Sequence, residues 1–503
     1  MKRSLAISLA TLTVIACGGQ TPAPLPPVAA APTASAPPVA AVPPPADPLG
    51  PRPETPQPAP YLPPAPVVIP GTNGITVWLL ERHQAPVVSC DLAVVAGASS
   101  DPQGKAGLAY VTANMLDEGA GTRGAIDLAR AIDNLGARIH TDANADASFV
   151  SLAVATRNFD KAFALFGDVV ARPRFEPAEF KRVKDLWANE LLAREKDPDA
   201  TARVVYRVAL FGSDHPYGHP WDGSPQSAKA VSLDDVKRFY ATEWRPDRAT
   251  LVCAGDVTAQ ELTPLMSAAF GGWKAPAKPV PAPVAPAAPK GPWPRLVLVD
   301  RADAPQSVIA AVKPGIAASS PDMPPLWRVN DAIGGSFNSR LNQDLRETHG
   351  YTYGARSRYS LSRGPGQVVS WANVVTDKTG DAMAAMLADL QKFAEGGMFP
   401  DEVDRTRWQA RGDLVGVYET VEGIAGHLAG DASLGLPADY QAKAAEARDA
   451  ADKTVLDRLA RQFYDPAGAI LVVVGPRARV QPMIDKLGLP APEIRDAEGS
   501  VVK

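Results

Sequence analysis

One order of strand and helix signals occurs twice along the 503-residue chain, and this repeat limits the possible folds more than any other feature. Residues 173–179 and 397–402 each introduce a long helical pattern, and their starts lie 224 positions apart. The apolar runs 250–255 and 470–475, typical of buried strands, lie 220 positions apart. Two unrelated matches would not be expected to have nearly the same offset, so the two halves are copies of one unit. We therefore expect an α+β fold of two tandem homologous domains, each a mixed β-sheet covered by helices on one face.

The hydrophobic periodicity gives the elements of each half. In the first half we expect strands at 75–81, 87–96 and 249–255, a strand pair within 137–155, and helices at 104–116, 126–135, 158–171, 176–196, 199–211, 232–242 and 258–269. In the second half we expect strands at 295–301, 306–313, 352–361, 366–373 and 469–474, and helices at 324–334, 337–348 and onward to about 461. The first domain therefore spans 67–274 and the second 295–490, with a tail at 491–503.

Proline marks the segments outside these domains. Of the 51 prolines, 27 lie within residues 21–66 and 275–294. Such segments favour polyproline II and have too few large apolar residues to build a core. We assign 18–66 to a Pro/Ala-rich tether and 275–294 to a linker between the domains. At ~3.1 Å per residue, the tether could hold the body up to roughly 140 Å from its anchor. Recognition by an SH3-type domain is the alternative, typical of a eukaryotic cytosol.

The N-terminus reads as an export signal. Lys2 and Arg3 precede an apolar stretch at 5–16, which is too short to span a bilayer as a stable helix. The four residues that end at Cys17 resemble the bacterial lipobox, whose cysteine is acylated and becomes the mature N-terminus; a plain signal peptide is the alternative. Gly18 in place of aspartate implies sorting to the outer membrane. We therefore expect a signal peptide at 1–17 and a lipid-anchored protein with a periplasmic body.

Charge and cysteine content exclude several classes of protein. The net charge of −4 offers no basic field for nucleic acid. Besides Cys17 there are two cysteines, Cys90 and Cys253, and their spacing matches no zinc motif. Both lie in apolar runs that read as strands, so a disulfide between them requires those strands to be neighbours.

Six short stretches carry a family resemblance. They are 107–116, 215–220 (HPYGHP), 244–247 and 255–257 in the first half, and 334–341 (GGSFNSRL) and 345–347 in the second. Together with the strands around them, they resemble the pitrilysin/insulinase-type zinc metallopeptidases, the inverted zincins, which include the processing peptidases. The match covers nearly all of 67–490. It implies the two-domain fold of that family and peptides or unfolded polypeptides as substrates.

The zinc motif of this family is altered in the present chain. Active members carry H-x-x-E-H, in which two imidazoles one turn apart hold zinc and the glutamate acts as general base. The resemblance places Tyr110, Ala113 and Asn114 at these positions and Glu190, 76 residues after Asn114, at the third ligand. Tyrosine, with a pKa near ~10, is a poor ligand, asparagine is a weak one, and alanine cannot accept a proton. We therefore expect no metal in this chain; by itself, Glu190 is typical of a solvated helix carboxylate.

A second set of functional positions is kept. In the non-zinc half of active relatives, an arginine and a tyrosine seven residues apart bind substrate carbonyls near the scissile bond. Arg346 and Tyr353 have this spacing, and the neighbouring residues 339–341 fix the register. Donors directed at the developing oxyanion contribute a few kcal/mol each in a dry site. The alternative is that Arg346 is a helix-end cation and Tyr353 a strand aromatic.

These features predict a subunit with no zinc of its own. Bacterial relatives often work as heterodimers in which one subunit carries H-x-x-E-H and zinc, while the other carries the Arg/Tyr pair. The resemblance therefore implies a homologous H-x-x-E-H partner and a peptide substrate that adds as a strand to a sheet edge. The alternative is a non-enzymatic scaffold or peptide-binding lipoprotein that keeps the peptidase fold, as in the core proteins of the respiratory cytochrome bc complex. A third reading is a self-sufficient peptidase with an unusual site.

The histidines offer no replacement metal site. His215 and His219 are four residues apart, but the intervening Pro216 and Gly218 exclude a helix that would align them. The resemblance gives this stretch a structural role in a loop. The remaining histidines, His83, His140, His349 and His427, are isolated in the sequence.

The lipobox makes a direct prediction. If Cys17 is acylated, Cys17→Ala moves the protein from the membrane fraction to the soluble periplasm without unfolding it, because the tether separates the anchor from the body. Cell fractionation and immunoblotting measure the distribution, and circular dichroism checks the fold. An unchanged membrane fraction contradicts the lipoprotein assignment.

Overall fold

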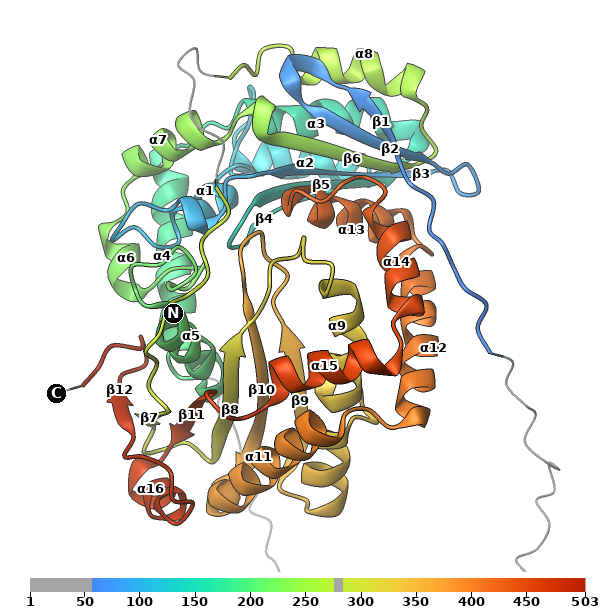
Figure 1. Cartoon of the computed structure of the whole chain (residues 1–503). Helices are drawn as coiled ribbons and strands as arrows, with labels where there is room; N and C mark the ends of the chain where they lie inside the picture. Colours follow the sequence, from blue (N-terminus) through green and yellow to red (C-terminus); the bar gives the residue numbers. More distant parts are fainter. Residues whose placement is uncertain (1–56, 276–283, 503) are drawn as a thin grey trace, which may run out of the picture. The chain divides into compact units, whose positions relative to one another are not determined.

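The computed structural model describes residues 57–275 and 284–502 (Figure 1). The predicted signal peptide, Cys17, most of the tether and part of the interdomain linker lie outside these residues. The compact body begins at Gln57. In the described part of the chain, no helix is long and apolar enough to cross a membrane.

The first half builds a six-stranded sheet in the order β1-β2-β6-β3-β5-β4. The strands are β1 (Val67–Pro70), β2 (Thr76–Glu81), β3 (Val87–Val94), β4 (Arg138–Ala143), β5 (Ser148–Ala155) and β6 (Ala249–Gly255). The β2–β6 pair is parallel and the other pairs are antiparallel. The sheet is therefore mixed, as predicted.

The second half repeats this order. Its strands are β7 (Leu296–Asp300), β8 (Gln306–Pro314), β9 (Thr352–Tyr359), β10 (Gln367–Val375), β11 (Ile470–Gly475) and β12 (Glu493–Arg495), arranged β12-β7-β11-β8-β10-β9. Five strands match the first sheet position by position. The edge beside β7 differs, because β12 comes from the end of the chain and pairs parallel, whereas β1 precedes β2 and pairs antiparallel. The duplicated α+β fold is confirmed.

Helices connect the strands in both halves. The first half contains α1 (Leu108–Asn114), α2 (Ala125–Asn134), α3 (Phe159–Ala171), α4 (Pro177–Arg194), α5 (Pro198–Phe211), α6 (Pro225–Ala230), α7 (Leu233–Glu243) and α8 (Ala259–Phe270). The second contains α9 (Met323–Asn330), α10 (Arg340–Asn342), α11 (Thr379–Gly396), α12 (Pro400–Val417), α13 (Val421–Ser433), α14 (Tyr440–Ala450), α15 (Lys453–Tyr464) and α16 (Arg477–Asp485). Two π-helical turns, η5 (Asp331–Gly335) and η6 (Gln343–Thr348), follow α9 and α10.

One face of each sheet is covered by helices of its own half. In the first half, Phe163 and Phe166 of α3 meet Phe270 of α8 edge-on beneath the sheet, with ring centres 5.9 and 6.1 Å apart. In the second half, Phe393 of α11 meets Tyr464 of α15 in the same way at 5.7 Å. These buried aromatic clusters form the two main cores.

The other face of each sheet is covered by a helix from the opposite half, which the sequence analysis did not predict. Helix α5 of the first half packs Val205 and Leu210 against the second sheet, where Val308 and Val472 are buried. Figure 1 shows α5 beside β8 and β11. The prediction that helices cover one face only is therefore corrected: the second sheet lies between two helical layers.

The exchange is reciprocal. Helix α13 of the second half packs Ile424 and Leu428 against the first sheet, where Trp78 and Val252 are buried. In Figure 1, α13 lies along the first sheet on the face away from α3. Because both faces of the central strands are buried, β6 and β11 read as continuous apolar runs and not as alternating ones.

A disulfide joins Cys90 and Cys253 across the first sheet. The two residues lie directly opposite each other in the antiparallel β3–β6 pair, with Cα atoms 4.1 Å apart. The condition set by the sequence, that the two strands be neighbours, is met.

Several boundaries differ from the predicted ones. The helix expected at 104–116 is the shorter α1, because Gly104 and Gly107 take positive φ before it. The helix expected at 337–348 is the short α10 followed by η6. Residues 57–66 of the predicted tether lie on the body, and β12 lies within the predicted tail. Strand β1 and helices α6 and α16 were not predicted, because their patterns are short.

The exchanged helices make a testable prediction about stability. Leu428 is 1% exposed against the first sheet, so Leu428→Ala should lower the free energy of unfolding by about 2–5 kcal/mol. Leu186 of α4 is 51% exposed, so Leu186→Ala should change the free energy of unfolding by less than about 0.5 kcal/mol. Chemical denaturation measures both. Equal effects of the two variants contradict the assignment of α13 to the core of the first sheet.

Candidate functional site

Helix α1, which carries the altered zinc motif, begins at a glycine with a special conformation. Gly107 has a φ of +84°, and an added Cβ would lie 2.6 Å from the ring of Trp187. The carboxyl oxygens of Asp101 accept hydrogen bonds from the N–H groups of Gly107 and Ala109 at 2.7 and 2.8 Å. Burial raises the pKa of Asp101 to about 8. These contacts fix the start of α1 against α4.

The structure brings Tyr110 and Glu190 together. The Tyr110 hydroxyl donates a hydrogen bond to Oε2 of Glu190 on α4 at 3.3 Å. The ring of Tyr110 lies edge-on to Trp221 at 5.4 Å and tilted against Trp187 at 6.5 Å. Burial is the main cause that raises the pKa of Tyr110. A neutral phenol among aromatic rings therefore stands where the resemblance puts a ligand histidine.

The remaining motif positions complete a site that does not fit zinc. Ala113 is fully buried and offers only a methyl group at the position of the general base. Asn114 is half-buried and hydrogen-bonded to Tyr110, and Glu190 is exposed. A phenol, an amide and one solvated carboxylate do not make the imidazole-rich donor set that zinc prefers. Helices α1 and α4 lie side by side, but their side chains at these positions are not those that bind zinc.

In the second half, Arg340 anchors the segment that leads to Arg346. Its guanidinium makes a two-pronged ion pair with Glu402 at 2.7 and 2.6 Å and donates to the carbonyl of Gly397 at 2.8 Å. It is sandwiched between the rings of Phe393 and Phe399, at 4.8 and 4.0 Å. Arg340 is therefore a structural clamp between α10 and the start of α12.

Arg346 and Tyr353 point away from the core. Arg346 lies on η6, with its guanidinium over the ring of Phe337 at 4.5 Å and 3.4 Å from the carboxylate of Glu347. Phe337 is itself 61% exposed. Tyr353, the second residue of β9, is 90% exposed. An arginine and a tyrosine at the surface are available to a molecule that approaches from outside.

The two groups of site residues stay separate within one chain. Tyr110 and Glu190 belong to α1 and α4 of the first half, whereas Arg346 and Tyr353 belong to the second half. Across residues 57–275 and 284–502, no hydrogen bond or ion pair joins one group to the other.

The 215–220 loop joins the two halves. The Tyr217 hydroxyl donates to Oδ1 of Asp146 at 2.6 Å and accepts from the N–H of Gly364 in the second half at 3.0 Å. Nδ1 of His215 accepts a hydrogen bond from the backbone N–H of Tyr217, and Nε2 of His215 lies 2.9 Å from the carbonyl oxygen of Ala287. Both imidazole nitrogens have backbone partners, so the contacts of His215 are structural.

Two further histidines, His83 and His349, have local partners. His83 lies 2.8 Å from Asp256, a hydrogen bond that raises the pKa of the imidazole. His349 stacks on Tyr351 with ring centres 4.8 Å apart. In the described part of the chain, no group of three or more His, Cys, Asp or Glu could hold a metal ion.

The residues that position the site carry little signal in the sequence. Asp101, Trp187 and Glu402 orient α1 and α10, yet none belongs to a recognisable motif. A signal for Glu402 does exist, because an acidic residue at the third position of α12 also caps that helix by accepting from the N–H of Phe399 at 2.7 Å. Its pairing with Arg340 is a tertiary contact between residues 62 positions apart.

Comparison with known proteins assigns the family. The model of the insulinase family (peptidase family M16) matches residues 76–211, and that of the M16 inactive domain matches residues 230–410. An uncharacterized zinc protease of Mycobacterium tuberculosis is 29% identical over 374 residues, which are 73% of this chain and 82% of that protein. A non-peptidase homolog of Helicobacter pylori is 22% identical over 325 residues, 64% of this chain and 74% of that protein.

A solved structure agrees with these matches. The peptidase M16 inactive domain of Pseudomonas fluorescens superimposes with a TM-score of 0.76 at 21% identity, covering 82% of this chain and 98% of that one. The paired six-stranded sheets thus define a protein with the fold of the M16 peptidases. The chain belongs to the insulinase family, peptidase family M16, and resembles the members that lack H-x-x-E-H.

The site predicts the zinc content of the protein. The purified chain should hold no stoichiometric zinc after dialysis, as measured by elemental analysis. The double variant Tyr110→His/Asn114→His supplies two imidazoles one turn apart beside Glu190 and should gain about one zinc per chain. Adding Glu190→Gln to the double variant should weaken that binding. One zinc in the unaltered chain, lost on changing Glu190 or His215, contradicts this assignment.

Proposed function

We propose that this chain is the non-zinc, substrate-stabilising subunit of an insulinase-type metallopeptidase that acts on peptides or unfolded polypeptides. Its partner is a homologous subunit that carries H-x-x-E-H and the zinc. The complex is held at the bacterial outer membrane through Cys17, with the body in the periplasm. The observation that carries the proposal is the contrast between the two halves. Tyr110 and Ala113 stand where the resemblance puts zinc chemistry, whereas Arg346 and Tyr353 have the spacing of the substrate-binding pair and lie at the surface.

The arrangement of Arg346 and Tyr353 supports a binding role. A purely structural arginine resembles Arg340, which is clamped by Glu402 and two aromatic rings. Arg346, in contrast, is about a third exposed, and its ion pair is with the adjacent Glu347. A surface ion pair of this kind contributes little to stability. Tyr353 is 90% exposed, so its phenol is free to contact a bound molecule.

The chemistry of the pair suits a peptide carbonyl. When a hydroxide attacks a peptide bond, negative charge develops on the carbonyl oxygen. A guanidinium and a phenolic O–H are both donors for that oxygen. Strand β9 lies at the end of the sheet order and pairs with β10 on one side only. A peptide that adds to the free edge of β9 would pass beside Tyr353.

The disulfide supports the proposed compartment. Disulfides persist in oxidising environments such as the bacterial periplasm and are rare in the cytosol. The Cys90–Cys253 bond therefore agrees with export of the body. The proposed lipid on Cys17 would then leave these two cysteines free to pair with each other.

A scaffold that has lost all activity is the second candidate. Tyr110, Trp187 and Trp221 form an aromatic cluster at the former zinc position, as expected where packing has replaced catalysis. The two candidates differ in what they require of Arg346 and Tyr353. A scaffold does not need either side chain.

Reconstitution with an H-x-x-E-H relative tests the proposal. The mixture should cleave peptides that neither protein cleaves alone. In the complex, Arg346→Ala and Tyr353→Phe should each lower kcat by about 10²–10³ with little change in KM, because a donor directed at the oxyanion acts mainly in the transition state. Initial rates across substrate concentrations give both constants.

The control is Arg461→Ala on α15, an exposed arginine far along the chain from the pair, which should leave kcat unchanged. Size-exclusion chromatography shows whether each variant still assembles with the partner. If the complex is active and neither Arg346→Ala nor Tyr353→Phe alters kcat, the pair is structural and the scaffold is the better account.

A further inference from the structure

The second half contains a cavity of about 420 Å³, partly open to solvent, that the proposed peptidase function does not use. It is lined by side chains from α9, β9, α12, α13 and α14. The position is informative, because α9 and α12 correspond in the repeat to α1 and α4, which carry the altered zinc motif. The volume falls within the range of ~300–1,000 Å³ that is usual for small-molecule sites.

Helix α13 separates this cavity from the first sheet. Ile424 and Leu428 point from one face of the helix into the core of the first sheet. His427 and Asp431 project from another face and line the cavity. The residues of each pair are four positions apart, which places both members of a pair on the same face of the helix. One wall of the cavity is therefore formed by a helix that is itself packed against the first sheet.

Two nitrogen atoms in the cavity wall are buried without partners. Nε2 of His427 and Nη2 of Arg448 have no hydrogen-bond partner in the described part of the chain. The guanidinium of Arg448 is oriented by a bond from its Nε to the carbonyl of Ala444 at 3.3 Å. Nη2 of Arg448 is a donor, and Nε2 of His427 is one in the tautomer that carries its proton there. Leaving a buried donor unsatisfied is costly, so a molecule that accepts from these nitrogens has an energetic reason to bind.

The acidic groups around the cavity are already engaged. Both carboxylate oxygens of Asp431 accept from the amide of Gln441, at 3.0 and 2.8 Å. Asp413 accepts from Gln409 at 2.7 Å. The wall nitrogens without a hydrogen-bond partner are therefore Nη2 of Arg448 and Nε2 of His427, and Arg358 adds a second guanidinium to the lining. The rest of the wall is largely apolar, including Trp327, Leu434 and Leu436.

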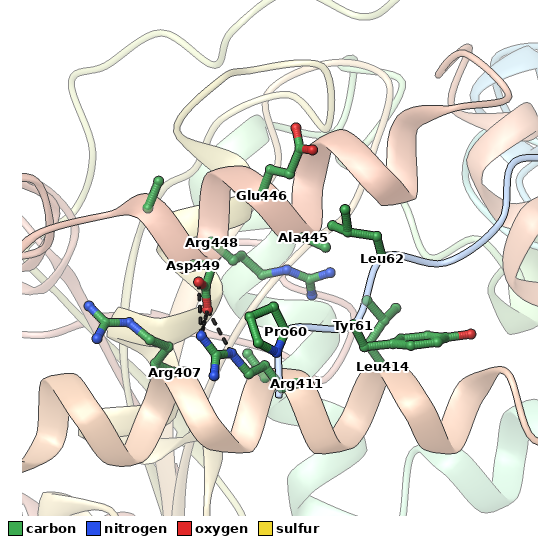
Figure 2. A pocket seen from close by; sticks show the side chains of 12 residues that line it. Pro60, Tyr61, Leu62, Arg407, Arg411, Leu414, Ala445, Glu446, Arg448 and Asp449 are labelled. Atoms are coloured by element: carbon green, nitrogen blue, oxygen red, sulfur yellow. Dashed lines mark hydrogen bonds and ion pairs between the residues drawn. The ribbon is translucent and has the colours of Figure 1, made fainter. Parts of the chain in front are cut away.

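The N-terminal strap, residues 57–66, lies over a shallow hollow that shares two lining residues with the cavity. Pro60, Tyr61 and Leu62 lie across α12 and α14 over a shallow hollow of about 270 Å³ (Figure 2). Arg448 and Leu414 line both this hollow and the inner cavity. Figure 2 shows the guanidinium of Arg448 extending from α14 towards the strap, above Leu414.

The strap is held by specific contacts. Arg411 forms a two-pronged ion pair with Asp449 at 2.8 and 2.9 Å and donates to the carbonyl of Pro58 at 2.5 Å. Tyr61 lies edge-on to Tyr418 with ring centres 6.1 Å apart. The strap is therefore fixed to α12 beside Arg448.

We propose that this cavity binds a small amphipathic carboxylate, with its carboxylate on His427 and Arg448 and its apolar body against Trp327, Leu434 and Leu436. A carboxylate accepts from both nitrogens, and the acidic side chains nearby already have their own donors. The apolar part of the wall favours an amphipathic acid over a fully polar anion such as phosphate. Such a carboxylate has two sources, a medium-chain fatty acid or the C-terminal residues of a peptide. The site does not depend on the proposed catalytic partner.

Isothermal titration calorimetry of the folded body with octanoate and with N-acetyl-leucyl-leucine tests the proposal. At least one of the two should bind one-to-one. The matching neutral compound, octanol or the dipeptide amide, should bind at least about tenfold more weakly, because it lacks the charged acceptor. The compound that binds identifies the source of the carboxylate. Failure of both acids to bind at millimolar concentration overturns the proposal.

Variants locate the binding. Arg448→Gln and His427→Gln should each weaken binding roughly tenfold or more. Leu434→Phe, which fills the apolar end, should weaken it without removing either donor. Arg407→Gln is the matched control, since Arg407 lines the outer hollow but not the cavity, and it should bind as the unaltered protein does. Melting temperatures confirm folding. Equal affinity in all four variants places the acid elsewhere and overturns the proposal.

Discussion

The rest of the structure depends on the exchange of helices between the two halves. Helix α5 leaves the first half to cover the second sheet, and α13 leaves the second half to cover the first. Each sheet would otherwise expose a broad apolar face, which soluble monomers rarely tolerate. The two copies of the repeat are therefore one folding unit, although their strand orders match like those of separate domains. The exchange also sets α13 between the first sheet and the cavity of the second half.

The sequence predicts the strands well because the exchange buries them on both faces. The runs of β6 and β11 are apolar throughout, so their position and length follow from composition alone. What covers the second face does not follow, because the amphipathic pattern of α5 or α13 shows that a helix has an apolar side but not which sheet it meets. The short elements β1, α6 and β12 have too few residues to show any period.

The candidate site also has a part that the sequence predicts and a part that it does not. The register of the motif gives Tyr110 and Glu190, and the structure brings them into contact because α1 and α4 are adjacent. The residues that fix this geometry, such as Asp101 and Trp187, act through tertiary contacts that carry no local signal. The cavity beside His427 and Arg448 was equally hidden, since its wall is drawn from five separate elements. A motif can be recognised in the sequence by its residue types and spacing, whereas a cavity lined by distant elements cannot.

The central claim is that a substrate peptide lies against Tyr353 when the chain is paired with a zinc-bearing relative. The most direct measurement is photo-cross-linking with Tyr353→p-benzoylphenylalanine in the mixed complex and a labelled peptide, with the same group placed at Arg461 as the control. The account predicts a peptide cross-link at position 353 that requires the partner, and none at 461. Absence of a peptide adduct at 353 in an active complex contradicts the account.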